Sequence, residues 1–145
     1  MRIGIISDTH LSSGNCALPE KLAAEFKSCG IIIHAGDLVD TCVLDALGKI
    51  GKVDAVYGNM DSYSVKSKLE YKKTMIVEGK KICVMHGYGH PDKLEEVLKN
   101  EFFSEKPDII IFGHSHVPKN EYIDGVLFFN PGSATDTVFA PYRSY

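Results

Sequence analysis

The chain has 145 residues, 44% of them hydrophobic, which is enough for one domain with a buried core and too few for two. Its formal charge of -3 comes from acidic and basic residues mixed along the chain, which excludes a broad basic face for a nucleic acid backbone. No apolar run approaches the ~20 residues of a membrane span, and no signal peptide pattern is present. We therefore expect one domain over residues 1–145, cytoplasmic and without membrane contact.

The four cysteines are widely spaced and form no Cys-X-X-Cys pair. In a cytoplasmic chain of this size they are expected to be reduced thiols, because an aliphatic core removes the need for disulfides. Two disulfides are the alternative that their even number leaves open. These residues are Cys16, Cys29, Cys42 and Cys83.

The first sixty residues alternate short apolar runs with longer amphipathic segments, a pattern that predicts strands and helices in turn. Such βαβαβ units have parallel strands that are covered on both faces. Asp40 or Thr41 is expected to cap the second helix. The predicted strands are Ile3–Ile6, Ile31–Ile33 and Val53–Tyr57, and the predicted helices are Pro19–Ser28 and Thr41–Ile50.

The second half of the chain predicts two hairpins around a helix and a buried strand. Gly79 marks the turn of the first hairpin, and the dipeptide Asp124-Gly125 marks the turn of the second. Pro91 suits the first turn of the helix. The predicted elements are the hairpin Lys72–Val77 and Lys81–Met85, a helix from Pro91 to Phe103, the strand Asp108–Phe112, and the hairpin Asn120–Ile123 and Val126–Phe129.

A residue able to bind a metal follows five of the predicted strands. In open α/β sheets the carboxyl ends of parallel strands line the ligand crevice, so residues at these strand exits are expected to converge. Two of the exits carry a second donor two residues further on, His10 and His116. The donors directly at the exits are Asp8, Asp37, Asn59, His86 and His114.

Together the donors are two carboxylates, four imidazoles and one amide oxygen. Such a nitrogen and oxygen set suits Mn, Fe, Zn, Ni or Co and differs from the thiolate cage of a structural zinc site. Seven donors exceed what one ion uses, which predicts two ions bridged by a carboxylate. Asp37, the lone carboxylate at a central strand exit, is the expected bridge.

Each part of this pattern also has an ordinary structural explanation. A single aspartate after a strand is usually a helix cap or a turn former, and Asn59 in a Gly-Asn pair is typical of a turn. Capping does not require imidazole, however, and four of the six histidines fall at the strand exits. Metal binding is the interpretation that accounts for the joint pattern.

The ordered motifs resemble the calcineurin-like metallophosphoesterase superfamily. They are Asp8-Thr9-His10, Gly36-Asp37, Gly58-Asn59-Met60-Asp61, His86-Gly87, Gly113-His114-Ser115-His116 and Asn130-Pro131-Gly132-Ser133. The last motif is similar to the small single-domain bacterial and archaeal phosphodiesterase branch, to which the scaffold subunit of the eukaryotic retromer complex is related. The resemblance implies an α/β fold, a four-layer α/β/β/α sandwich of two mixed sheets flanked by helices, with a dinuclear metal site at the C-terminal edge of the strands. It assigns one ion to Asp8, His10, Asp37 and His116 and the other to Asp37, Asn59, His86 and His114.

The resemblance also implies a divalent-metal-dependent phosphodiesterase, in which a hydroxide bridging the two ions attacks phosphorus in line. Manganese is the expected ion, with nickel, zinc, iron, cobalt or magnesium as alternatives, and a small phosphoester is the expected substrate. Because a monoester dianion usually requires a guanidinium clamp, the presence of only two arginines, Arg2 and Arg143, favours diesters. A phosphomonoesterase or nucleotidase of the same fold, and a metal-binding scaffold for protein partners without turnover, are the alternatives. A homodimer or homo-oligomer is compatible with the sequence.

The sequence departs from the family pattern in two places. Met60 stands where many members carry a histidine that protonates the leaving group, so His90 is a candidate general acid, with an exposed loop histidine before Pro91 as the alternative. Asp61 is expected to support the site, orienting His10. The family usually continues past the Asn130 motif into a further strand, whereas this chain ends at Tyr145, so one sheet edge is expected to be short.

Overall fold

Parallel pairing organises the first half of the chain. In the computed structural model, which describes residues 1–145, β1 (Ile3–Ile6), β2 (Ile31–His34) and β3 (Val53–Ala55) form a parallel sheet in that order. Helices α1 (Glu20–Phe26) and α2 (Cys42–Gly48) connect the strands and confirm the predicted βαβαβ unit. Thr41 is the N-cap residue of α2 but makes no capping side-chain bond, whereas the Asp40 carboxylate accepts from the Cys42 amide at 3.0 Å. The short helix α3 (Tyr63–Lys66) was not expected, because a single turn shows no periodicity.

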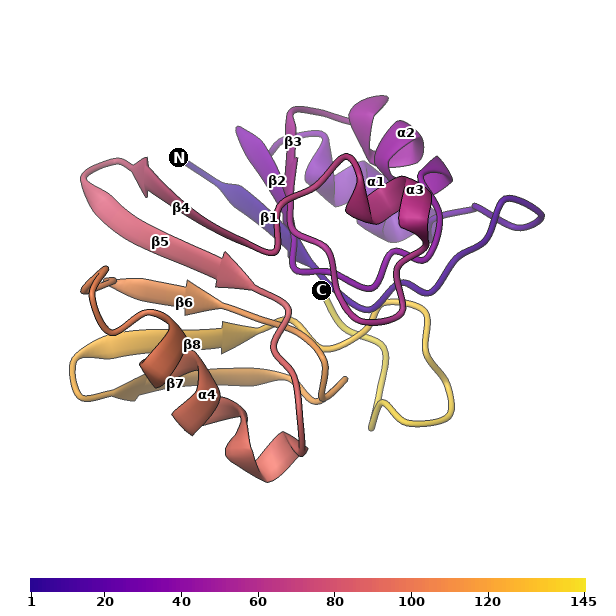
Figure 1. Cartoon of the computed structure of the whole chain (residues 1–145). Helices are drawn as coiled ribbons and strands as arrows, with labels where there is room; N and C mark the ends of the chain where they lie inside the picture. The colour runs from indigo at the N-terminus through magenta and orange to yellow at the C-terminus, as the bar shows by residue number, and fades with distance from the viewer.

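The second sheet has five strands in the order β4-β5-β6-β8-β7. Its central strands β5, β6 and β8 are parallel, and the outer pairs β4–β5 and β7–β8 are the two predicted hairpins. Figure 1 shows α1 to α3 outside the first sheet and α4 outside the second, which confirms the four layers. The elements of this half are β4 (Lys72–Val77), β5 (Lys80–Met85), the 3-10 helix η1 (Pro91–Lys93), α4 (Leu94–Glu101), β6 (Ile109–Ile111), β7 (Lys119–Ile123) and β8 (Val126–Asn130).

Both hairpins turn through residues with a left-handed backbone. Glu78 and Gly79 have φ of 48° and 78°, and Asp124 and Gly125 have φ of 51° and 83°. Positive φ at both central residues is the conformation that matches the twist of a two-residue hairpin. The turns therefore lie where Gly79 and the Asp124-Gly125 dipeptide predicted them.

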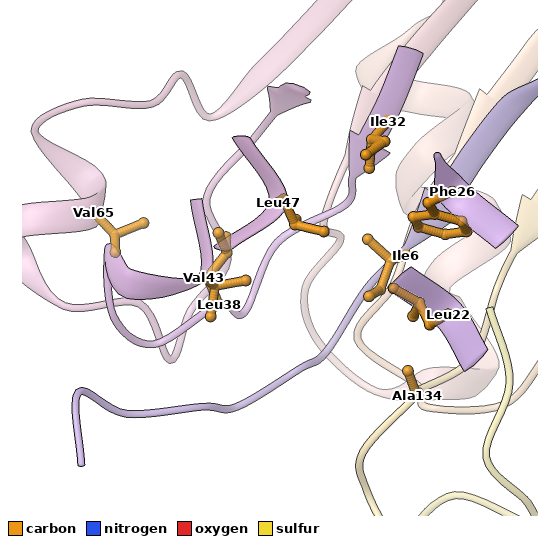
Figure 2. Packing of buried hydrophobic residues seen from close by; sticks show 9 residues of the cluster. All are labelled: Ile6, Leu22, Phe26, Ile32, Leu38, Val43, Leu47, Val65 and Ala134. Atoms are coloured by element: carbon orange, nitrogen blue, oxygen red, sulfur yellow. The ribbon is translucent and has the colours of Figure 1, made fainter. Parts of the chain in front are cut away.

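Buried side chains fill the three spaces between the four layers. Along β5 the side chains alternate, because Ile82 and Val84 pack against the first sheet while Cys83 and Met85 pack under α4. Burying such aliphatic side chains on both faces of each sheet is the main stabilising term of the fold. Figure 2 shows the cluster between the first sheet and its helices: Ile6, Leu22, Phe26, Ile32, Leu38, Val43, Leu47, Val65 and Ala134.

The cysteine expectation is wrong for one pair. Cys16 and Cys42 form a disulfide with a Cα separation of 6.1 Å, while Cys29 and Cys83 are free. A bridge between Leu11 and Val39 holds the loop after β1 beside the segment that leads into α2, which brings the two thiols together. The two cysteines are 26 residues apart, a spacing that matches no known cysteine motif, so the sequence alone could not predict that they pair.

The segment after β8 adds an isolated bridge between Ser133 and Arg143 and no further strand. The first sheet ends at β1. The ring of Tyr145 packs edge-on against Phe26, with centroids 5.7 Å apart. None of the helices is long and apolar enough to cross a membrane.

Candidate metal centre

The strand exits of both sheets meet at one edge of the molecule. Within each sheet a backbone hydrogen bond joins neighbouring exits. The Asp8 amide donates to the Gly36 carbonyl at 3.0 Å, and the Gly113 amide donates to the His86 carbonyl at 3.1 Å. The His114 amide, which belongs to the second sheet, donates to the Asp8 carboxylate of the first at 3.1 Å. Donors more than a hundred residues apart in sequence therefore share one site.

The Asp8 carboxylate is fully buried among three histidine rings. Its Oδ1 atom lies 3.2 Å from Nε2 of His116, 3.8 Å from that of His86 and 3.9 Å from that of His10. Burial raises the pKa of this carboxyl, but the surrounding rings and the hydroxyl of Ser7 outweigh burial and hold the pKa well below its usual range. Asp8 is therefore a carboxylate that faces into the site.

Asp37 supplies the second buried carboxylate. Its Oδ2 atom lies 3.2 Å from Nε2 of His86 and 3.5 Å from Nε2 of His10, while Oδ1 accepts from the Met60 amide at 2.8 Å. Burial raises the pKa of Asp37, and the neighbouring His86 more than offsets this, so the pKa is lowered. Two ionised carboxylates thus face the same histidines.

His86 provides a test of whether the site fits a cation. Its Nδ1 atom lies 2.8 Å from the Ala35 carbonyl, which only accepts, so Nδ1 carries a proton. In the neutral ring Nε2 is then a bare lone pair, buried without a hydrogen-bond partner and facing the carboxylates of Asp8 and Asp37. A lone pair opposite two carboxylates is stable only when a cation lies between them, so these residues fit a divalent ion.

In the absence of an ion, a proton on His86 offsets the negative charge of the Asp8 and Asp37 carboxylates. Burial lowers the pKa of His86, but the carboxylates of Asp37 and Asp8 outweigh burial and raise the pKa above the ordinary histidine value. A metal ion would have to displace this proton, as is usual for histidine ligands.

The donors fall into two adjacent groups. Within each group the candidate ligand atoms lie within 4.8 Å of one another. Asp8 belongs to both groups, whereas the family resemblance implies that Asp37 is the shared residue. The groups are Asp8, His10 and His116, and Asp8, Asp37 and His86.

Asn59 and His114 lie at the more exposed side of the site. Nε2 of His114 is 2.8 Å from the Gly89 carbonyl and therefore carries a proton, which leaves Nδ1 as a lone pair in the neutral ring. This Nδ1 lies 3.1 Å from Oδ1 of Asn59. Both residues line the pocket, so both could act as ligands there.

The family model for the calcineurin-like phosphoesterase superfamily domain matches residues 1–145. The chain belongs to the calcineurin-like phosphoesterase superfamily. A probable metallophosphoesterase of Methanocaldococcus jannaschii is 38% identical over 138 residues, which cover 93% of this chain and 69% of the relative. The structure of an archaeal phosphodiesterase matches with a TM-score of 0.75 and 28% identity, covering 92% of this chain and 85% of that one. Vps29 of Entamoeba histolytica, solved with zinc, matches with a TM-score of 0.76 and 26% identity, covering 93% and 76%.

In this calcineurin-like phosphoesterase, the Asp61 carboxylate accepts hydrogen bonds from backbone amides and not from a histidine. Its carboxylate accepts from the amides of Gly58 at 2.7 Å, Val39 at 2.6 Å and Asp37 at 3.0 Å. None of its hydrogen bonds goes to His10, so the orienting role expected from the sequence is wrong in this detail. Asp61 instead fixes the turn that carries Asp37.

His90 lies outside the pocket over the metal-binding residues. Its side chain is 72% exposed, and its Nδ1 atom accepts from the Asp92 amide at 3.3 Å, which caps η1. This position is the exposed loop histidine that the sequence left as the alternative, and a general acid role for His90 stays a prediction. Met60, 57% exposed, lines the pocket and carries no proton to donate.

Several supporting residues escaped the sequence analysis. Asn130 donates to the Gly113 carbonyl at 2.9 Å and to the Ser115 hydroxyl at 3.1 Å, so it shapes the loop of the two histidines. The Ser133 hydroxyl donates to the Asp8 carbonyl at 2.7 Å. The motif of Asn130 and Ser133 was visible in the sequence, but only tertiary contacts reveal what its polar groups hold.

Buried His34, the last residue of β2, also escaped the sequence analysis. Its Nδ1 accepts from the Gly36 amide and its Nε2 meets the Thr9 hydroxyl, both at 3.1 Å. Burial lowers the pKa of His34 to about 3, so the ring stays neutral and serves structure.

A pocket of about 660 Å³ opens over the metal-binding residues. Its lining includes His10, His114 and His116 together with the apolar side chains of Leu11, Met60, Val138 and Phe139. No lysine or arginine lines it. An anionic group entering the pocket therefore meets positive charge only at the metal-binding residues.

Proposed function

We propose that this chain is a divalent-metal-dependent phosphodiesterase with two ions held between the strand exits of its two sheets. The observation that carries the proposal is the buried pair Asp8 and Asp37, faced by imidazole lone pairs whose opposite ring nitrogens are already bound. Membership of the superfamily and similarity to an archaeal phosphodiesterase support it. The proposed ligands are Asp8, His10, Asp37, Asn59, His86, His114 and His116.

Some residues of the site would bind the ions and exclude solvent, and others would face the substrate. Divalent ions would lower the pKa of bound water toward neutrality and offset charge on the phosphoryl oxygens. Asp8 and Asp37, both buried, keep the inner side of the site anionic and closed to solvent. His10 and His114 at the pocket wall leave the outer side open to a substrate.

The residues that line the pocket favour phosphodiesters with good leaving groups as substrates. A monoester dianion usually needs a guanidinium clamp, and no arginine lines the pocket. An alkoxide leaving group would need a proton donor, whereas Met60 has none and the Asp136 carboxyl has its pKa lowered to about 2, with burial outweighed by hydrogen bonds from backbone amides and His116. A leaving group that departs as a weak base needs no such donor.

The test is hydrolysis of bis(p-nitrophenyl) phosphate by the metal-free protein resupplied with Mn²⁺, Zn²⁺, Ni²⁺ or Mg²⁺. We expect metal-stimulated cleavage that His86→Ala reduces by at least about a hundredfold, because a buried ligand is lost. Tyr122→Ala, on exposed β7, serves as the control and should keep full activity. Equal activity in His86→Ala would overturn the proposal.

The same assay separates the alternatives. A phosphomonoesterase would cleave p-nitrophenyl phosphate faster than the diester. A scaffold without turnover would bind metal in calorimetry and cleave neither substrate. The similarity to zinc-bound Vps29 is the reason to test for this outcome.

A further inference from the structure

The His116 ring is held between two carboxylates. Its Nε2 atom lies 3.2 Å from Oδ1 of Asp8, and its Nδ1 atom is hydrogen bonded to Oδ2 of Asp136. The side chains of His116 and Asp136 are only 13% and 12% exposed, so this contact is largely shielded from water.

Asp136 is itself fixed by the backbone around it. Its carboxylate accepts from the amides of Val138 at 2.8 Å and Ala140 at 3.1 Å. The Asp136 amide donates to the Ser133 hydroxyl at 3.0 Å, and that hydroxyl donates onward to the Asp8 carbonyl. The carboxylate therefore cannot rotate away from His116 without breaking several bonds.

We propose that Asp136 is a positioning residue that sets the tautomer of His116 for metal binding. Both ring nitrogens face carboxylates, which only accept. In the neutral ring that a metal requires, the closer carboxylate, Asp136, keeps the proton on Nδ1, so Nε2 presents its lone pair toward Asp8. Such carboxylate–histidine pairs orient metal ligands and strengthen them. The inference rests on the metal site of the proposed function but not on hydrolysis.

The test is Asp136→Asn. With its oxygen kept for the Val138 amide, the NH₂ group takes the Oδ2 position and faces His116, at the cost of the Ala140 hydrogen bond. Nδ1 then accepts, the proton moves to Nε2, and the lone pair that would face the metal is lost. We expect the Kd for Zn²⁺ and Mn²⁺, measured by calorimetry, to rise about 10- to 100-fold. Nitrogen-15 NMR of the metal-free proteins, at a pH where the ring is neutral, should show the His116 proton on Nδ1 in the unaltered chain and on Nε2 in the variant.

Asp124→Asn, an exposed carboxylate in the β7–β8 turn, is the matched control and should change neither quantity. Asp136→Ser keeps a capping hydroxyl and supplies a second variant if the asparagine variant folds poorly. Unchanged metal affinity together with an unchanged His116 tautomer would overturn the proposal, whatever the protein's activity.

A second inference comes from the apolar side chains in the pocket lining. Val138 and Phe139 are 78% and 77% exposed, although both line the pocket beside the histidines. The Phe139 ring meets His116 edge-on with centroids 6.3 Å apart. Leu11, Met60 and Pro91 extend the apolar lining.

We infer that Phe139 and its apolar neighbours in the lining bind an aromatic group of the phosphoester while phosphorus faces the metal centre. A lining without lysine or arginine offers no counter-charge to a highly charged substrate, whereas an aromatic ring gains contact area and edge-to-face geometry with Phe139. This inference rests on the proposed function and specifies its substrate class.

The test needs no turnover. Calorimetry on the Zn²⁺-loaded protein would compare phenylphosphonate with methylphosphonate, whose anionic groups match. We expect phenylphosphonate to bind about tenfold more tightly, and Phe139→Ala to remove that preference while keeping the affinity for methylphosphonate. Tyr142→Ala, exposed on the same segment but outside the pocket lining, should keep the preference. Equal binding of the two phosphonates by the unaltered protein would overturn the inference.

Discussion

Five of the candidate ligands have a backbone conformation that residues with a Cβ atom usually avoid. Asp8, His10, Asp37, His114 and His116 all have φ between 46° and 69°. Left-handed backbone at non-glycine residues costs energy and clusters at functional sites, where the surrounding structure enforces it. Here the enforcing groups include Asn130, Ser133 and Asp61. The donors are therefore arranged by the fold itself before an ion binds.

Gly58→Ala tests how closely this arrangement is fitted. A Cβ atom at Gly58 would collide with the Asp37 carboxylate and the His86 ring, so we expect a stability loss of about 1 to 3 kcal/mol and weaker metal binding. Thermal denaturation and calorimetry measure the two effects. Gly48→Ala is the control, because a Cβ there meets open space within a helix and should stabilise by about 0.5 to 1 kcal/mol. Equal metal affinity in Gly58→Ala would contradict this account.

At the scale of elements, the secondary structure, the parallel βαβαβ unit and the two hairpins were predictable, and the strand order of the second sheet was not. Periodicity located β1, β2 and both hairpins because aliphatic runs and the Asp124-Gly125 turn act locally. The order β4-β5-β6-β8-β7 depends on which strands meet in space, and no sequence pattern encodes this. The strand-exit donors were found because the exits share one edge, whereas Asp136 was not, since it lies in a loop with no flanking strand.

Helix α4 should contribute stability without contributing to the metal site. Leu98, a residue of α4, is fully buried in the cluster between this helix and the second sheet. Leu98→Ala should lower the free energy of unfolding by about 2 to 5 kcal/mol, because it leaves a cavity. Urea denaturation measures this loss, and calorimetry on the folded variant should return an unchanged Kd for Zn²⁺. A large loss of metal affinity would mean that α4 reaches the site.

For the whole molecule, the donors come from both sheets, with Asp8 and Asp37 on one side and His86 and His116 on the other. An ion bound between them would link the two halves and stabilise the folded state by mass action. The thermal midpoint should therefore rise on adding Zn²⁺ and fall with EDTA.

The dependence on pH should have opposite signs with and without metal. Asp8 and Asp136 raise the pKa of His116 to about 9 against the ordinary value of 6.5, despite partial burial. In the metal-free protein this ring stabilises the fold fully below pH 6.5, and the contribution disappears as pH rises through 9. Metal binding requires the unprotonated ring, so metal affinity should increase over the same interval.

Thermal denaturation at pH 6.5 and 9.5, with EDTA or with Zn²⁺, measures both trends. A metal-free midpoint that rises with pH across this interval would contradict the pKa of His116. The Cys16–Cys42 disulfide is kept oxidised throughout, so that its reduction does not contribute.

The parallel strands that gather every donor at one edge also leave the opposite edge free for engineering. The turns at Gly79 and at Asp124-Gly125 precede β5 and β8, so they lie at the ends of these strands away from the histidines. A short peptide tag inserted between Asp124 and Gly125 should therefore leave the Kd for Zn²⁺ unchanged. The same tag inserted between Asn59 and Met60 should abolish binding, so the molecule has one end suited to attachment and one that tolerates no added chain.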